Sequence, residues 1–357
     1  MPTYVVHVLN DAYAVRAVLA NTSNYADFRS IDYRIAINGI DSCTLEIVPS
    51  SSKLAQLITM NRILLYRDGV LQFGGTILKT SWNIGIDATD DTIQIDCLGG
   101  GIYLDWRLIV PSAGNATDER TDQADDLAKA YVTHHASSTA DVAARQFSDL
   151  TVQADAGACS SWTETPSYEI LLDEVQKLQK LGGFDWRCVP SATGYEFQTG
   201  YPQWGLDRTF GNGVNTDAVL SLDRRNYSRV GYSKDTMGHY NYVYVGGATA
   251  IRERSTAGDV TAYKRRERWE SASSYEDNTA VDYIGDMRLR EMAVTEGMEA
   301  MPLAKTWKDP WDIGDLVTIK ADRYGMTYQD DVKITAVNVR VDADGVETVE
   351  PEMIGGV

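Results

Sequence analysis

The sequence predicts a β-rich α+β protein with a β-domain of barrel or sandwich type at each end and a small α/β domain inserted between them. Short runs of β-branched and aromatic residues recur with turn signals at close spacing, which is typical of barrels and sandwiches. Helix formers at helical spacing interrupt these runs in the middle of the chain. The 357 residues are enough for two or three domains.

The first β-domain is predicted over residues 1–110, and its clearest element is a hairpin over 62–79. Two apolar runs flank Arg67, Asp68 and Gly69, and an Asp-Gly pair in this position favours a tight turn. Gly74 and Gly75 in the returning strand indicate a bulge or a close approach of another backbone. Further strands are predicted over 4–9, 34–38, 43–48 and 93–97, with a short helix over 50–58.

The inserted α/β domain is predicted over 111–220. Its main helix covers 165–181, where apolar residues recur at near-helical spacing and Gly182 and Gly183 end the pattern. A second helix is predicted over 125–132, and a strand pair over 184–188 and 195–198.

The second β-domain is predicted over 221–357. A strand over 240–245 has a candidate partner at 263–269, and a helix is predicted near 282–298. Strands over 315–320, 331–341 and 346–349 follow, the last two joined by an Asp344-Gly345 turn. This turn also explains the Asp342-Ala-Asp-Gly stretch, because the ligand spacing of a calcium-binding EF-hand is missing.

Several short strand-and-turn stretches occur in an order and at a spacing that resemble a known family. Arg-Asp-Gly at 67–69 leads into Val-Leu-Gln-Phe-Gly-Gly-Thr-Ile at 70–77, after Leu-Glu-Ile-Val-Pro at 45–49. Gly-Gly-Phe-Asp-Trp-Arg follows at 182–187, and further stretches lie at 201–208, 241–247 and 311–319. Together they span most of the chain and resemble the baseplate-hub or tail-hub proteins of siphophages.

The resemblance implies two tail-tube-like β-domains in each chain and a homotrimer, so that three chains present six such domains to a six-fold tube. It implies a structural protein of the virion tail tip, assembled in the host cytoplasm. The implied partners are a distal tail or tube protein, the tape-measure protein, and receptor-binding or tail-fibre proteins. DNA would pass through the channel without sequence-specific binding.

The net charge of −18 argues against a surface built to neutralise phosphates. No apolar run is long enough to form a membrane-spanning helix. The four cysteines, Cys43, Cys97, Cys159 and Cys188, lie far apart, and we expect free buried thiols rather than a zinc or disulfide framework.

No residue pattern predicts catalysis, a metal or a cofactor, so we expect none of these. The His-Glu-x-x-His motif is missing, and we expect His134 and His135 to be exposed at a helix end. Cys159 is the one cysteine in loop-like surroundings, but a cysteine nucleophile needs a base and none is indicated. We expect acid pairs such as Asp125-Asp126 to be solvated loop residues rather than a glycosidase pair.

The candidate functional residues are therefore assembly and turn positions. They are Arg67, Asp68, Gly69, Gly74 and Gly75 at the first hairpin, Trp311 and Gly314 at a second one, and Arg265 and Arg266 in a basic cluster. That cluster, with Arg252, Arg254, Lys264 and Arg268, either meets an acidic partner or is a solvated strand pair.

Twenty tyrosines and eight tryptophans fit an assembly protein, because aromatic residues dominate the energetics of interfaces. They fit a carbohydrate-binding β-module equally well, and this is the main alternative. A cell-wall hydrolase is a third.

Overall fold

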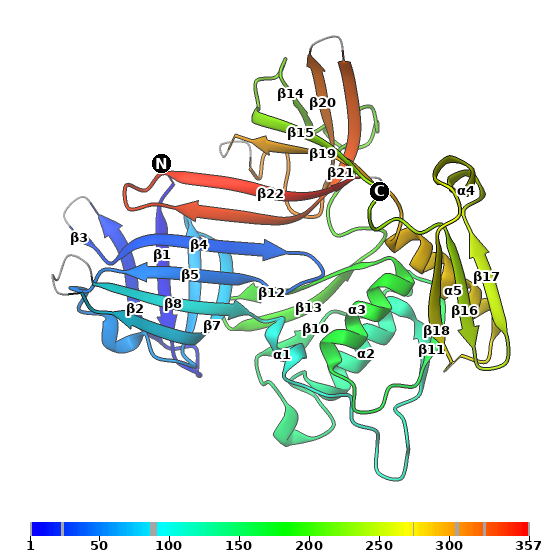
Figure 1. Cartoon of the computed structure of the whole chain (residues 1–357). Helices are drawn as coiled ribbons and strands as arrows, with labels where there is room; N and C mark the ends of the chain where they lie inside the picture. The colour runs from blue at the N-terminus through cyan, green and yellow to red at the C-terminus, as the bar shows by residue number, and fades with distance from the viewer. Residues whose placement is uncertain are drawn as a thin grey trace.

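The computed structural model describes residues 2–22, 25–85, 91–273, 275–303, 307–323 and 326–355. These described residues are rich in strands, which form one large sheet and four small ones. In Figure 1 the large sheet lies at the left and top, the helices α2 and α3 lie below, and a lobe containing β16, β17, β18 and α5 lies at the right. The predicted fold class, a β-rich α+β protein, is confirmed.

The large sheet has 12 strands, in the order β14-β20-β21-β4-β5-β8-β7-β6-β1-β2-β3, with β22 paired to β21. The strands are β1 (Tyr4–Leu9), β2 (Val15–Thr22), β3 (Tyr25–Ala26), β4 (Phe28–Ala36), β5 (Ser42–Ile47), β6 (Arg62–Arg67), β7 (Val70–Asn83), β8 (Thr92–Gly99), β14 (Val219–Ser221), β20 (Leu316–Arg323), β21 (Met326–Val341) and β22 (Glu347–Gly355). Over the described residues its backbone pairing does not close into a barrel.

The two ends of the chain share this sheet. β21 pairs antiparallel with β4, from Ala336 opposite Ala36 to Val341 opposite Ile31. Side chains from both ends accordingly form one apolar core, in which Leu45 of β5 and Val317 of β20 are both buried. The strands near the C-terminus therefore extend the sheet that the N-terminal strands begin.

The segment predicted as the insert, residues 111–220, packs helices against a small sheet in the order β10-β13-β12. A cap glycine, Gly183, with φ of 70°, ends α3, as its sequence predicts. The elements before β14 are β9 (Arg120–Gln123), α2 (Ala124–His135), η3 (Ala143–Arg145), β10 (Leu150–Val152), β11 (Ser161–Glu164), α3 (Leu171–Gly182), β12 (Asp185–Ser191) and β13 (Gly194–Gly200), preceded by η1 (Leu54–Gln56) and α1 (Ile102–Asp105) near the first sheet.

Residues 227–302 form what we call the outer lobe. Its elements are β15 (Tyr227–Asp235), β16 (Tyr242–Gly247), β17 (Ile251–Ser255), α4 (Ala257–Tyr263), β18 (Glu267–Ala272), α5 (Asn278–Glu291) and β19 (Thr295–Pro302). Within the lobe, the antiparallel ribbon of β15 and β19 connects the sheet β17-β16-β18 to the rest of the chain, and α5 packs on that sheet. Figure 1 shows the ribbon leading from the large sheet to the sheet β17-β16-β18.

Two predicted elements of the outer lobe are wrong in their extent. The helix predicted near 282–298 begins earlier, at Asn278, where Asp277 caps it, and ends at Glu291. The residues that follow form β19, because pairing with β15 and burial of Met298 in the large core outweigh their local helix propensity. The predicted strand partner at 263–269 begins only at Glu267 and runs parallel to β16, while β17 is the antiparallel neighbour.

Candidate assembly interface

The first hairpin has the predicted turn. Asp68 has φ of 50° and Gly69 has φ of 79°, so both central residues take the left-handed conformation that a tight two-residue hairpin requires. Asp68 also ties the turn to the N-terminus: its backbone N–H donates to Thr3 O at 2.8 Å, and its carboxylate accepts from Thr3 N at 2.7 Å. The turn residues thus serve the protomer's own fold.

Arg67 joins β6 to β22, two strands that are not backbone neighbours. Its guanidinium donates two hydrogen bonds to the Glu347 carboxylate, at 2.7 and 2.9 Å, and Tyr4 Oη donates to the same carboxylate. This bidentate bond raises the pKa of Arg67. The Arg67 guanidinium carbon also lies 5.4 Å from the centre of the Trp307 ring. Side chains thereby connect β6 and β22, between which the sheet has no backbone hydrogen bonds.

Gly74 and Gly75 lie in β7 at positions of close approach rather than in a bulge, since the register shifts of β7 fall at other positions. A Cβ on Gly74 would lie 2.7 Å from Pro190 Cβ, which belongs to β12 of the insert. A Cβ on Gly75 would lie 2.5 Å from the Phe73 ring. The neighbour at Gly74 is a side chain, so the insert packs directly on β7 there.

The sequence predicts a second hairpin at Trp311 and Gly314, and this prediction is wrong. Both residues lie in the turn that precedes β20. Trp311 is buried in the large core. Gly314 has φ of 84°, and a Cβ there would lie 2.7 Å from the backbone nitrogen of Gly205. The hairpin at this end of the chain instead joins β21 and β22 through residues 342–346, where Gly345 has φ of 78°, as predicted.

The basic cluster is partly neutralised within the outer lobe. Arg252 and Arg254 form bidentate pairs with Asp282 and Asp286 of α5, at 2.6 to 2.8 Å. Two of the six basic residues, both in β17, therefore hold α5 on the sheet. They neither wait for an acidic partner protein nor belong to a solvated strand pair, the two alternatives that the sequence offers for the cluster.

Arg265 and Arg266, the two candidates from this cluster, also contact their own lobe. The Arg265 guanidinium carbon lies 3.6 Å from the centre of the Tyr242 ring, and its nitrogen lies 2.6 Å from the Glu267 carboxylate. Arg266 donates to the backbone oxygens of Thr236 and His239. Arg266 is thus a structural residue, whereas Arg265 lies on a surface of aromatic side chains.

Two predictions about polar groups of the insert are wrong. His135 is buried, not exposed, and its Nε2 lies 2.7 Å from Asp118 Oδ2. Burial lowers the pKa of this imidazole. Asp125 and Asp126 are buried rather than solvated, because Lys129 lies 2.9 Å from Asp126 and backbone N–H groups of the loop at 156–159 donate to both carboxylates. These groups fix a loop against α2.

The cysteine prediction is confirmed for Cys43, Cys97 and Cys188, which are free and buried, whereas the free thiol of Cys159 is only half-buried. Burial and the neighbouring Asp125 carboxylate raise the pKa of Cys159 to about 12, so the thiolate that a nucleophile needs is disfavoured. In the part of the chain that the structure describes, no group of three or more His, Cys, Asp or Glu side chains is arranged to hold a metal ion. No helix there is long and apolar enough to cross a membrane.

A cleft of about 910 Å³ lies where the insert meets the outer lobe. Glu164 of β11 accepts hydrogen bonds from Tyr275 of the lobe at 3.1 Å and from Lys177 of α3 at 2.5 Å. Trp162 and Tyr283 meet edge to face with ring centres 4.8 Å apart. The walls carry acidic, aromatic and hydroxyl side chains, and they join two parts of the chain.

Sequence reasoning missed the partners of the candidate residues. Glu347 is separated from Arg67 by 280 positions, and no local pattern marks either residue as part of a pair. Pro190, whose side chain leaves no room for a Cβ at position 74, lies in a different part of the chain from the hairpin. The paired glycines were the one local signal of a close contact.

Comparisons with known proteins agree with this architecture. The chain has the fold of a tail protein from prophage MuSo2 of Shewanella oneidensis, with TM-score 0.65, 11% identity, and coverage of 98% of this chain and 97% of that one. The tail protein from Neisseria meningitidis MC58 gives TM-score 0.62 and 12% identity, over 99% and 96% of the two chains. A structure of the Francisella PdpA–VgrG complex matches 99% of this chain but 53% of its own, with TM-score 0.54 and 8% identity.

The fold is thus that of phage tail proteins. A family model described as Siphovirus ReqiPepy6 Gp37-like protein matches residues 6–355, and the chain belongs to this family. This finding confirms the resemblance to siphophage tail proteins that the strand-and-turn stretches carry. The comparison with curated proteins found no match.

Proposed function

We propose that this chain is a structural tail-hub protein whose homotrimer continues or closes the tail tube at the virion tip. The main support is the tail-protein fold over nearly the whole chain, together with the membership of a siphovirus family. The likeness to a chain of the PdpA–VgrG complex adds to it, because there too the fold is part of an assembly.

The organisation of the protomer suits a mechanical role. Tight turns and bidentate ion pairs stabilise the large sheet and the outer lobe internally. The contact of Gly74 with Pro190 joins the sheet to the insert, and the hydrogen bond from Tyr275 to Glu164 joins the insert to the lobe. The sequence candidates Arg67, Gly74, Trp311 and Gly314 act inside the protomer, so in this proposal they shape the subunit that assembles. A distal tail or tube protein, the tape-measure protein and receptor-binding or tail-fibre proteins are its partners, and DNA passes without sequence-specific contacts. The protein needs no cofactor and catalyses no reaction.

The trimer is tested by light scattering of the purified chain over a concentration series. We expect a species of three times the 39.5 kDa protomer mass, with a central hole in negative-stain images. Virions carrying an affinity tag on this chain, labelled with gold, should show the label at the tail tip.

A chain that is monomeric at every concentration and is missing from the tail tip would overturn the proposal. A trimer whose gold label is spread along the tail tube would also contradict the hub assignment, because it would indicate a tube subunit.

A further inference from the structure

The sheet β17-β16-β18 of the outer lobe has one covered and one open face. Val243 and Val245 of β16 are buried on the covered face, where Val281 and Ile284 of α5 pack against them. Side chains alternate between the two faces of a strand, so Tyr242 and Tyr244 point to the other face. That face carries the aromatic side chains of the lobe.

The neighbouring strands extend this aromatic surface. Trp269 of β18 is in register with Tyr244, and Ile251 of β17 is in register with Gly246. Trp269 is 56% exposed and Ile251 is 64% exposed, values that are high for large apolar side chains. We call Tyr242, Tyr244, Ile251 and Trp269, with their polar neighbours, the aromatic platform.

Polar groups already positioned by hydrogen bonds lie among these rings. Arg265 stacks on Tyr242 and donates to Tyr244 Oη at 2.6 Å. Tyr242 Oη donates to the carboxylate of Glu253 on β17, and Glu267 lies 2.6 Å from Arg265. Each carboxylate keeps further acceptor positions, because an ionised carboxylate has about four of them.

Gly246 helps to fix the orientation of Trp269. A Cβ at this position would lie 2.5 Å from the indole ring, so the ring rests directly on the backbone of β16. An indole held in this way loses little freedom when a ligand stacks on it, and preorganisation of this kind improves affinity.

We propose that the aromatic platform binds a neutral linear saccharide. The flat rings of Trp269 and Tyr244 match the apolar faces of pyranose rings, and Arg265 with the two carboxylates can bind the hydroxyl groups at the ring edges. A neutral chain is favoured because two carboxylates, Glu253 and Glu267, face the ligand beside the single guanidinium of Arg265, and the overall charge of −18 adds to the repulsion of anionic polymers.

The size of the platform favours a saccharide over a protein partner. Three strands about 4.8 Å apart, with about five residues each at about 3.4 Å per residue, give an area of about 250 Å². A standard protein interface buries about 800 Å² on each partner, so this surface alone is too small. A few sugar rings would cover it.

The test is isothermal titration of the full-length chain with three neutral tetrasaccharides: cellotetraose, maltotetraose and chitotetraose. We expect at least one to bind with Kd between about 0.1 and 1 mM, since an open surface buries only one side of its ligand. Trp269→Ala should weaken binding at least tenfold, Trp269→Tyr should restore part of it, and Glu253→Gln should weaken it less than Trp269→Ala does.

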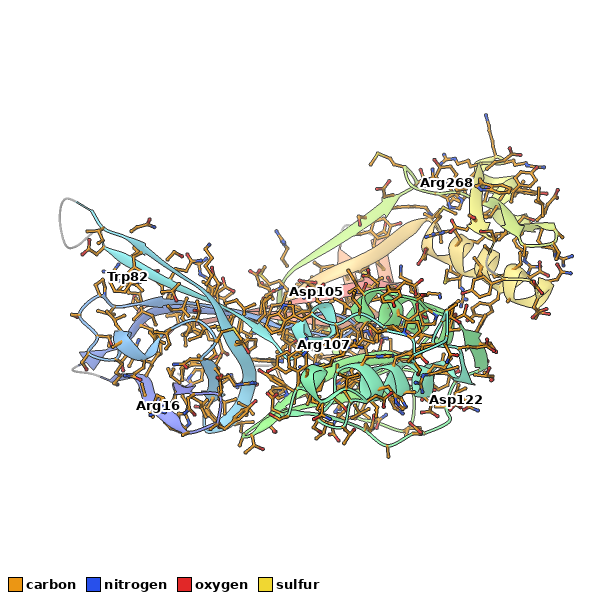
Figure 2. All side chains as sticks on the ribbon, turned by 90° about the horizontal axis from the view of Figure 1, so that it is seen from below. Arg16, Trp82, Asp105, Arg107, Asp122 and Arg268 are labelled. Atoms are coloured by element: carbon orange, nitrogen blue, oxygen red, sulfur yellow. The ribbon has the colours of Figure 1, made fainter. Side chains whose placement is uncertain are left out.

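Trp82→Ala is the matched control, because Trp82 is 57% exposed, against 56% for Trp269, and should leave binding unchanged. Figure 2 shows Trp82 at one end of the molecule and Arg268, the neighbour of Trp269, at the other. Because both indoles are exposed, we expect unchanged melting temperatures, which would confirm that the variants fold.

Three results would overturn the inference. One is no binding of any of the three sugars at about 10 mM. Another is equal affinity of the Trp269 and Trp82 variants. The third is loss of self-association by Trp269→Ala without saccharide binding by the unaltered chain, which would indicate a protein contact. The mass measurement described above tests the hub proposal separately, so the two proposals can fail independently.

Discussion

At the scale of single residues, the side chain of Arg67 connects two strands, β6 and β22, that are not joined by backbone hydrogen bonds. Its guanidinium and the Glu347 carboxylate are 20% and 6% exposed, and the pair joins β6 to β22. An ion pair this sheltered is costly to break from one side, because the remaining charge stays buried without its partner.

We expect Arg67→Ala to lower the free energy of unfolding by about 3 kcal/mol, because Glu347 then keeps its charge in a buried position. Urea denaturation measures the effect. Lys79→Ala is the control: Lys79 is 66% exposed and lies 3.5 Å from Asp96, so its loss should cost less than about 1 kcal/mol. Equal costs for the two variants would show that Arg67 is an ordinary surface residue.

At the scale of elements, the contact between β7 and β12 fixes the insert on the large sheet. Gly74 and Pro190 meet there with no room for a methyl group. Asp41 reinforces this junction through Arg187, whose nitrogen lies 3.1 Å from its carboxylate, with both residues buried. Small changes at this junction should therefore act on two parts of the chain.

Gly74→Ala should destabilise the protein by about 1 to 3 kcal/mol, because the added methyl group displaces β12 from β7. Hydrogen exchange should rise in β12 and β13. Gly231→Ala in β15 is the control, since a Cβ there meets nothing within 4 Å. Adding Pro190→Gly to Gly74→Ala should recover part of the loss if the clash is its cause. A purely additive double variant would argue against the contact.

The sequence predicts elements well where the determining residues are close together. The hairpin at Asp68 and Gly69 depends on a two-residue turn, and the end of α3 depends on Gly183. Both predictions are correct for this reason. The predicted end of α5 is wrong because β19 is defined by pairing with β15, a strand about 60 residues earlier, and local propensity does not contain that information.

The candidate site shows the same limit. The high aromatic content indicates a binding surface, but exposure of Trp269 beside Gly246 follows from the parallel pairing of β18 with β16. The helix α4 separates β17 from β18 in the chain, and no local pattern shows where the chain returns to the sheet. Pairing between distant strands therefore decides which aromatic residues are available to a ligand.

At the scale of the whole molecule, α3 connects the insert to the outer lobe. Lys177 of α3 lies 2.5 Å from Glu164 and 3.4 Å from Glu174, and its ammonium is 5.9 Å from the centre of the Tyr275 ring in the lobe. Lys180 of the same helix lies 3.0 Å from Glu291 at the end of α5. The charge state of this junction should consequently affect both parts.

Glu174 makes this junction sensitive to pH. Burial, opposed by Lys177 and assisted by the Glu164 and Glu169 carboxylates, raises the pKa of Glu174 from 4.5 to about 7. An acid with a raised pKa in the folded state binds more protons when folded than when unfolded. Its contribution to stability is therefore greatest below pH 4.5 and is lost as the pH rises to about 7.

Glu174→Gln should remove this loss, because an amide stays neutral at every pH. We expect the variant to exceed the unaltered chain in unfolding free energy at pH 8 by up to about 3 kcal/mol, and the difference to shrink towards pH 4. Melting temperatures across this range measure it. Asp173→Asn, an exposed position on the same helix, should show no such dependence. If the two variants behave alike, the junction is held by its Lys177–Glu164 pair and aromatic contacts, and the burial of Glu174 carries no electrostatic cost.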